Sequence, residues 1–124
     1  MINDRLTSLL TTFLDVQSRR AEVVSANIAN ADTPGYTAKE LKFDDFLRDA
    51  AREMMSPDSA DASKAHATGA PTLVEQSGNP VGVDGNNVDT AREMSALADA
   101  GMQYLAGAQM LQSRLKLMRA AIKG

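Results

Sequence analysis

The chain contains no cysteine and no tryptophan, and its 124 residues include only three Phe and two Tyr. The absence of cysteine excludes a disulfide scaffold and a zinc site built on thiolates. The scarcity of aromatic residues, together with abundant alanine, leaves few large side chains for a hydrophobic core. The chain can therefore form one small domain, but with a sparse core.

Basic residues are also scarce, because 13 Lys and Arg face 16 Asp and Glu for a net charge of -3. Without a basic cluster, this balance argues against binding to nucleic acid. No apolar run approaches the roughly 20 residues of a membrane span. The first residues, MINDR, lack the basic and apolar regions of a cleaved signal peptide. We therefore expect no transmembrane segment, and any export would need another route.

Residue patterns for catalysis or metal binding are nearly absent. The one histidine, His66, lies in a segment rich in Ala, Ser, Asp and Gly, where we expect it to be solvated. Residues 84–89, DGNNVD, partly match a calcium loop through Asp84 and Asn86. The match fails because Val88 stands where an acid or amide is needed, Asp89 where glycine is needed, and Ser95 where the bidentate Glu belongs. Glycine-rich phosphate loops and nucleophile elbows are missing as well. We therefore predict that the chain is not an enzyme and needs no cofactor or metal.

Apolar periodicity predicts a long amphipathic helix at the N-terminus, within residues 1–31. Its apolar face consists of Leu6, Leu9, Leu10, Phe13, Val24, Ile28 and Ala31. Gln17 and Arg20 interrupt this face; they either set register or partner choice in a helical bundle or lie in solvent where the stripe drifts. Several β-branched residues lower the intrinsic helicity, so this helix is expected to need a partner.

A second long helix is predicted within residues 87–124, where apolar or small residues repeat at alternating steps of three and four. This stripe consists of Met94, Leu97, Gly101, Tyr104, Ala108, Leu111, Leu115, Met118 and Ile122. Its spacing predicts a coiled-coil-like hairpin with the N-terminal helix. A weaker stripe on the far side consists of Met102, Ala106, Met110, Leu117 and Ala121. Two apolar faces require neighbours on both sides, through ordinary core packing or through other subunits.

Glycine occurs twice inside this second helix, at positions 101 and 107. Each glycine costs roughly 1 kcal/mol in a helix interior. We therefore expect Gly101 and Gly107 to permit a close approach of another backbone.

The middle segment, residues 32–86, is predicted to combine a turn, a short helix, a flexible linker and a small β-hairpin. The helix is placed at about residues 43–55, because its apolar residues share one side and its first turn is acidic. Residues 56–70 have the composition of a linker. Residues 71–74 and 81–83 can pair as the two strands of an irregular hairpin.

Two further signals lie at the entry to the last helix. Residues 84–87, DGNN, predict a turn. Asn87 or Asp89 can then cap the helix that follows.

The exit from the first helix is sharply specified. Pro34 cannot continue the helix, and Thr33 before it is biased toward an extended conformation. Pro34 and Gly35 suit the two central positions of a type II turn. Asn30 and Asp32 can hydrogen-bond to backbone groups at the helix end. The exit therefore predicts a joint that gives the next segment a defined direction.

The segment from Val24 to Tyr36, VSANIANADTPGY, closely resembles the N-terminal signature of the flagellar rod, hook and hook-junction proteins. Its DTPGY ending, then Leu41-Lys42-Phe43 and a short acidic helix, is most similar to the proximal rod members. The C-terminal half agrees in residues 84–89, Glu93-Met94, Tyr104 and the tail from Leu111 to Ile122. The two motifs stand at opposite ends of the chain and in the right order.

This resemblance implies a structural subunit of the bacterial flagellar basal-body rod, located in the periplasm and exported unfolded by the flagellar type III apparatus without a cleaved signal. The implied partners are further copies of the chain, neighbouring rod and basal-body proteins, and the export apparatus. The terminal helices would pair in the inner core of the rod. The assembly motif that would direct the middle segment outward consists of Asn27, Asn30, Asp32, Thr33, Pro34, Gly35 and Tyr36. The alternative is a soluble helical adaptor or export chaperone that binds partner helices through the same stripes.

Overall fold

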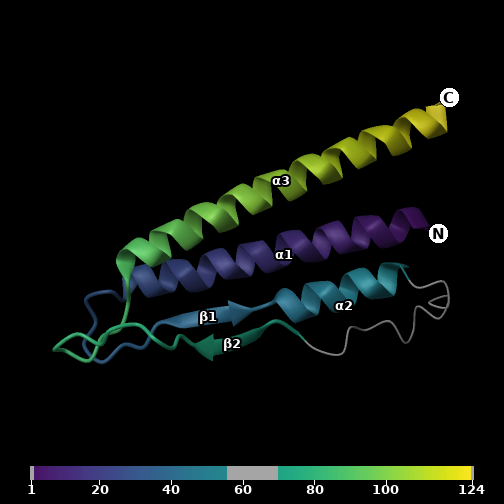
Figure 1. Cartoon of the computed structure of the whole chain (residues 1–124). Coiled ribbons are helices and arrows are strands. Elements are labelled where there is room, and N and C mark those ends of the chain that lie inside the picture. Colours follow the sequence, from purple (N-terminus) through teal and green to yellow (C-terminus); the bar gives the residue numbers. More distant parts are fainter. Residues whose placement is uncertain (1, 56–69, 124) are drawn as a thin grey trace.

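Two long antiparallel helices dominate the computed structural model, which describes residues 2–55 and 70–123. They are α1 (Ile2–Ala29) and α3 (Thr90–Lys123) (Figure 1). The chain order is α1, β1, α2, β2, α3. The predicted class, mainly α with a pair of terminal helices, a short helix and a small strand pair, is confirmed.

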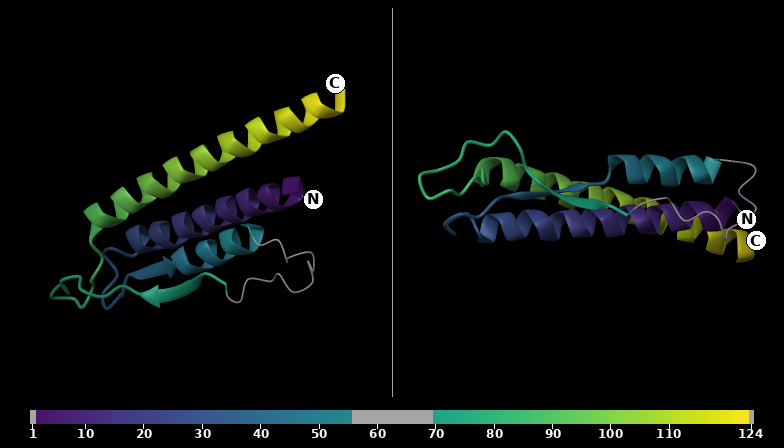
Figure 2. Two further views of the ribbon diagram at one scale, coloured as in Figure 1. Left: turned by 45° about the vertical axis from the view of Figure 1, so that its right-hand side comes forward. Right: turned by 90° about the horizontal axis from the view of Figure 1, so that it is seen from below.

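The helices α1 and α3 meet most closely where α1 ends and α3 begins, which we call the closed end. From there they diverge toward the two termini (Figures 1 and 2). Glu93, Ala100 and Gly107, seven residues apart on α3, are its buried residues. The small side chains at two of these positions allow the helix backbones to approach each other.

The middle segment lies along α1. Strand β1 (Lys39–Lys42) pairs antiparallel with β2 (Thr72–Glu75), with Lys39 opposite Glu75 and Lys42 opposite Thr72. Helix α2 (Asp44–Met55) follows β1 and runs beside the N-terminal half of α1 (Figure 2). The predicted short helix is confirmed, and its first turn carries Asp44 and Asp45, which favour the helix N-terminus.

The predicted hairpin partner is wrong. Residues 72–75 form a strand, but they pair with residues 39–42 and not with residues 81–83. Pro80 has no N–H to give to a ladder, and the Gly82 N–H donates instead to the Asn86 carbonyl within a tight loop. Strand β1, KELK, escaped prediction because Leu41 is its only apolar residue.

The predicted entry to α3 is confirmed in one of its two alternatives. Asp89 caps the helix, because its Oδ1 accepts from the Arg92 N–H at 3.2 Å and its carbonyl accepts from the Glu93 N–H at 3.0 Å. Asn87, the other candidate, binds elsewhere. The predicted linker, with His66, lies outside the described residues except for Ala70.

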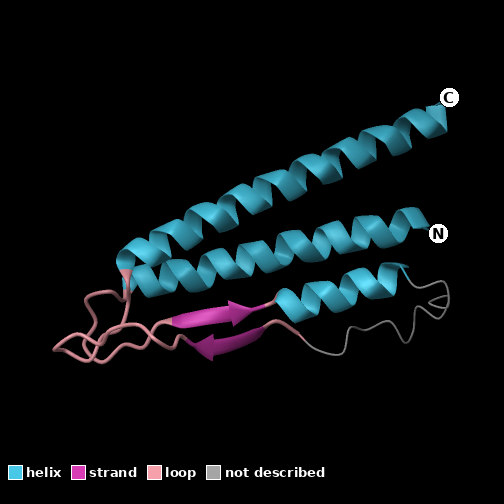
Figure 3. Ribbon diagram, viewed as in Figure 1, coloured by secondary structure: helices cyan, strands magenta, loops and turns pink. Residues whose placement is uncertain are grey.

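Loops gather at the closed end, where both long helices terminate (Figure 3). The described irregular segments between α1 and β1 and between β2 and α3 meet there. This convergence of loops defines the region in which polar side chains far apart in the sequence come together.

Candidate functional site

The candidate site is the joint at the closed end, which we define as residues 27–39 together with residues 76–93. Asn27, near the end of α1, is its centre and is completely buried. Its Nδ2 donates to the Lys39 carbonyl at 2.7 Å and to Glu93 Oε2 at 3.0 Å. Its Oδ1 accepts from the Lys39 N–H and from the Tyr36 hydroxyl, both at 3.0 Å. The Asn27 amide therefore has every donor and acceptor satisfied.

Asn27 binds both backbone groups of Lys39, as a residue on a neighbouring strand would. Strand β2 pairs with one edge of β1. On the other edge, the Asn27 side chain makes the hydrogen bonds that a third strand would make at this point. Hydrogen bonds to the Asn27 side chain thus help to fix the direction in which the middle segment leaves α1.

Glu93, in the first turn of α3, supplies the buried carboxyl group of the joint and is only 1% exposed. Its two oxygens accept from two amides: Oε2 from Asn27, and Oε1 from Gln76 Nε2 at 2.7 Å. Gln76 Nε2 also donates to the Lys39 carbonyl at 3.2 Å. The carboxyl group therefore joins α3 to α1 and to the segment that follows β2.

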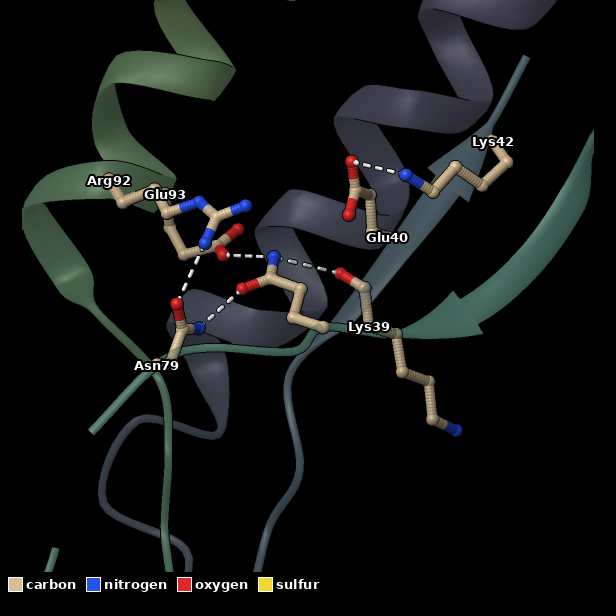
Figure 4. Close-up of polar contacts among 7 residues, drawn as sticks. Lys39, Glu40, Lys42, Asn79, Arg92 and Glu93 are labelled. Atoms are coloured by element: carbon tan, nitrogen blue, oxygen red, sulfur yellow. Dashed lines mark hydrogen bonds and ion pairs between the residues drawn. The ribbon is translucent and has the colours of Figure 1, made fainter. Parts of the chain in front are cut away.

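This network continues outward to the surface (Figure 4). Asn79 Nδ2 donates to Gln76 Oε1 at 2.6 Å and to the Asn87 carbonyl at 3.1 Å. Arg92 Nη1 donates to Asn79 Oδ1 at 2.7 Å. Glu40 and Lys42 form a separate ion pair at 3.7 Å on β1. Side chains from three separate segments thus connect in one continuous chain of hydrogen bonds.

Asn86 and Asn87 attach the entry of α3 to the exit of α1. Asn86 Nδ2 donates to the carbonyls of Asn30 and Thr33 at 2.9 and 2.8 Å, which satisfies acceptors at the end of α1. Asn87 Oδ1 accepts from the Ala38 N–H at 2.6 Å. Both asparagines are buried.

The turn after α1 forms as predicted. The Tyr36 N–H donates to the Thr33 carbonyl at 3.3 Å, and Gly35 has a φ of 74° at the third position of the turn. The Gly35 N–H also donates to the Asp84 carbonyl at 2.9 Å. A Cβ atom at Gly85 would lie 3.4 Å from Gly35 Cα, so two glycines allow the two loops to touch.

Five of the seven predicted motif residues therefore take part in hydrogen bonds at the joint. Asn30 contributes its own side chain as well, donating to the Ala26 carbonyl at 2.8 Å and accepting from the Thr33 hydroxyl at 3.1 Å. Asp32 and Pro34 are exposed on the outside of the turn. The sequence reasoning missed Gln76, Asn79 and the buried role of Glu93.

A cleft of about 340 Å³, lined by both polar and apolar residues, lies beside the joint and is bordered by α1, β1 and α3. Arg20 lies at this cleft, with Nη1 2.7 Å from Asp99 Oδ2 and its guanidinium carbon 5.6 Å from the centre of the Phe43 ring. Of the two residues that interrupt the apolar face, Arg20 thus bridges α1 to α3. Gln17 is buried, and its Oε1 has no hydrogen-bond partner among the described residues.

The predicted packing residues of α1 mostly face inward. Leu10 and Val24 are buried, and Leu6, Phe13 and Ile28 are partly buried.

On α3 the predicted stripe is divided. Leu97, Ala108, Leu111 and Met118 are partly buried, whereas Met94, Gly101, Tyr104, Leu115 and Ile122 are exposed in the single chain. The fully buried positions are each one residue earlier than Met94, Gly101 and Ala108.

The described residues offer no metal centre, since no group of three or more His, Cys, Asp or Glu among them could hold an ion. Asp84 Oδ1 and Asn86 Oδ1, which the partial calcium-loop pattern pairs, instead accept from the N–H groups of Asn86 and Val88. None of the described helices combines the length and apolar character needed to cross a bilayer.

Comparison with known proteins places the chain in a family. The sequence model of the family described as "Flagella basal body rod protein" matches residues 14–37, which span the second half of α1 and the turn. The chain is 34% identical over 115 residues to the flagellar basal body rod protein FlgB of Aeromonas hydrophila, covering 90% of this chain and 87% of that protein. It is 36% identical to the FlgB protein of Escherichia coli K12, covering 85% of this chain and 83% of the relative.

These relatives are named as structural components of the rod, which agrees with the prediction that the chain is not an enzyme. Both matches cover most of the chain and most of the relative. The chain belongs to the family of flagellar basal body rod proteins, with the FlgB proteins as its relatives, and is a structural subunit of the flagellar basal body rod.

Proposed function

We propose that the chain is a proximal rod subunit that assembles with further copies and with neighbouring rod proteins through the outer faces of its terminal helices. The observation that carries this proposal is the exposed apolar surface of α3. It consists of Met94, Met102, Tyr104, Leu105, Met110, Leu115, Leu117 and Ile122, with exposed fractions from 43% to 84%.

Coverage of these side chains would stabilise an assembly strongly. Burying one large apolar side chain contributes roughly 1.5–3 kcal/mol. Within the chain, α3 packs against α1 along one face. The conformational entropy lost on ordering the backbone costs roughly 1–2 kcal/mol per residue and opposes this packing. Contacts with neighbouring subunits would bury further apolar surface of the same two helices. Binding would therefore stabilise the ordered helices, and ordered helices would bind more readily.

Gly101 supports the same proposal. A Cβ atom at this position would meet nothing within 4 Å, so no contact within the described chain explains a glycine in a helix interior. Close approach of a helix from another subunit would explain it. In this arrangement the joint holds α1 and α3 together at one end and turns the chain back, so that β1 and α2 lie along α1.

Export without a cleaved signal through the flagellar type III apparatus, and a periplasmic position, belong to the same proposal. The resemblance of the motif and family membership support this part of the proposal. Unfolding for export requires that the chain be held by weak forces, and the sparse core of small residues is suited to this.

The test is assembly in flagellated cells that carry this chain as their only copy of the protein. Deletion of residues 115–124 is expected to abolish swimming and to remove the chain from purified basal bodies. Leu117→Glu, on the exposed face, should act in the same direction, whereas Gln109→Glu, on an exposed polar position of α3, serves as control. Normal swimming after the deletion would contradict the proposal.

Cell fractionation distinguishes the adaptor or export chaperone. A rod subunit is recovered with intact basal bodies, whereas an adaptor or chaperone stays in the soluble cytoplasmic fraction.

A further inference from the structure

We infer that Glu93 is a positioning residue that determines the register of α3 against α1. Asn27 and Gln76 donate the hydrogen bonds through which it does so. This inference concerns the fold of the single chain and stands independently of the proposed assembly. It begins from three contacts along the helix pair: Asn27 to Glu93, Arg20 to Asp99, and Phe13 to Gly107.

These contacts recur every seven residues along α1. Seven residues along α3 separate the buried positions Glu93, Ala100 and Gly107 in the same way. A second row on α3, Leu97, Tyr104, Leu111 and Met118, also repeats every seven residues. For this row, a shift of α3 by seven residues, about 10 Å along its axis, would superpose apolar positions on apolar positions. This row alone therefore leaves the register ambiguous.

Glu93 removes this ambiguity. It is the buried acidic residue among the described side chains, and its two oxygens accept hydrogen bonds from two buried or half-buried amides. A seven-residue shift in one direction would place Ala100 opposite Asn27 and deprive the Asn27 amide of an acceptor. A shift in the other direction would move Glu93 toward Arg20 and away from Gln76. An unsatisfied buried donor costs about 1–3 kcal/mol, so either shift is disfavoured.

The same contact couples register to the direction of the middle segment. Asn27 Nδ2 donates both to Glu93 on α3 and to the Lys39 carbonyl on β1. One orientation of the amide therefore binds both elements. A single buried polar side chain that fixes helix register is a known device in coiled coils. Here the device also fixes the strand that leaves the helix pair.

Cysteine pairs test the register, because the chain has no cysteine of its own. Phe13→Cys with Gly107→Cys reports the observed register, since the removal of the Phe13 ring leaves room for the new side chain. Phe13→Cys with Ala100→Cys, and Phe13→Cys with Arg114→Cys, report the two shifted registers. Each pair is oxidised in the purified full-length chain, and the intramolecular disulfide is quantified by mass spectrometry.

The three pairs are compared in chains with Glu93, Glu93→Gln and Glu93→Met, and with Glu22→Met as the exposed control on α1. With Glu93 and in the control, we expect the observed-register disulfide to predominate. In Glu93→Met its ratio to the shifted disulfides should fall by about tenfold, because both acceptors are lost. Glu93→Gln keeps one acceptor and should fall between the two.

A ratio that does not change in Glu93→Met would overturn the inference, even if that variant were less stable. Equal yields of the three disulfides in the chain with Glu93 would also overturn it. If Glu93→Met loses its helical circular dichroism, the nearly isosteric Glu93→Gln decides: a lowered ratio supports the inference and an unchanged ratio refutes it. The assembly proposal is tested in cells and is unaffected by either result.

Discussion

The ring of Phe13 lies directly against the backbone of Gly107, so that a Cβ atom there would come 2.9 Å from Phe13 Cδ1 and 3.1 Å from Leu14 Cδ2. Gly101, on the same helix, faces open space. The two glycines, which have the same helix propensity, therefore differ in what they contact. Gly107 allows α1 and α3 to approach within the chain, as the sequence predicted, while Gly101 has no such role in the described structure.

This difference predicts that alanine stabilises the chain at position 101 but not at position 107. Gly101→Ala should raise the free energy of unfolding by about 1 kcal/mol through helix propensity. Gly107→Ala gains the same amount but loses about 1–3 kcal/mol to overpacking against Phe13, so its stability should stay level or fall. Urea unfolding followed by circular dichroism at the helical band measures both. Equal stabilisation by the two substitutions would show that Phe13 does not restrict Gly107.

Asn86 should be essential to the joint. In Asn86→Asp the amide that donates to the carbonyls of Asn30 and Thr33 becomes an acceptor, and negative charge approaches the negative end of the α1 dipole. We expect a loss of about 1–3 kcal/mol in the free energy of unfolding. Asp32→Asn, an exposed substitution between the two residues that Asn86 contacts, is the control and should change stability little. A loss no larger than that of the control would mean that these two hydrogen bonds contribute nothing.

Whether a feature can be predicted from the sequence depends on how far apart in the chain its interacting residues lie. The ends of α1, the turn at Thr33–Tyr36 and the cap at Asp89 are set by neighbouring residues, so local chemistry predicts them. The Asn27–Glu93 contact joins residues 66 positions apart, and no local signal marks it. Glu93 reads as an ordinary acidic residue in a first turn until α1 is placed beside it.

The stripe on α3 shows the same limit. The sequence favoured the larger residues Met94 and Leu115, whereas the seam within the chain is built on Ala100 and Gly107, where small size permits contact. On α3 the fully buried apolar positions are thus small, whereas the large apolar residues are partly buried or exposed. Strand β1 escaped prediction for a related reason, since pairing with β2 and hydrogen bonds to Asn27, and not an apolar alternation, hold it in place.

The pair Arg20 and Asp99 should contribute modestly, and mainly through Arg20. The Asp99 side chain is 52% exposed, so the ion pair is screened by solvent, whereas the Arg20 side chain is 21% exposed and packs over Phe43. Asp99→Asn should cost less than about 1 kcal/mol, and the cost should shrink in high salt. Arg20→Ala should cost more because packing is lost too. The control is Asp45→Asn, which removes an exposed ion pair with Arg48. Urea unfolding at low and high salt compares the three variants, and equal costs for Arg20→Ala and Asp99→Asn would contradict the packing contribution.

Hydrogen exchange should be slowest at the joint and fastest at the diverging helix ends. The Ala38 N–H donates to the buried Asn87 Oδ1 at 2.6 Å, and the Lys39 N–H donates to Asn27. Both donors are held by side chains that are themselves buried, so exchange at these sites requires the joint to open. The last turns of α3 are largely exposed, so their amides need only local fraying in order to exchange.

Exchange measured by nuclear magnetic resonance should therefore show higher protection at residues 38 and 39 than at residues 117–123. Asn87→Ala should accelerate exchange at Ala38 more than at the middle of α1. Uniform protection along α3 up to Lys123 would contradict the expected gradient, because the single chain would then already be ordered over the surface that the rod is proposed to cover.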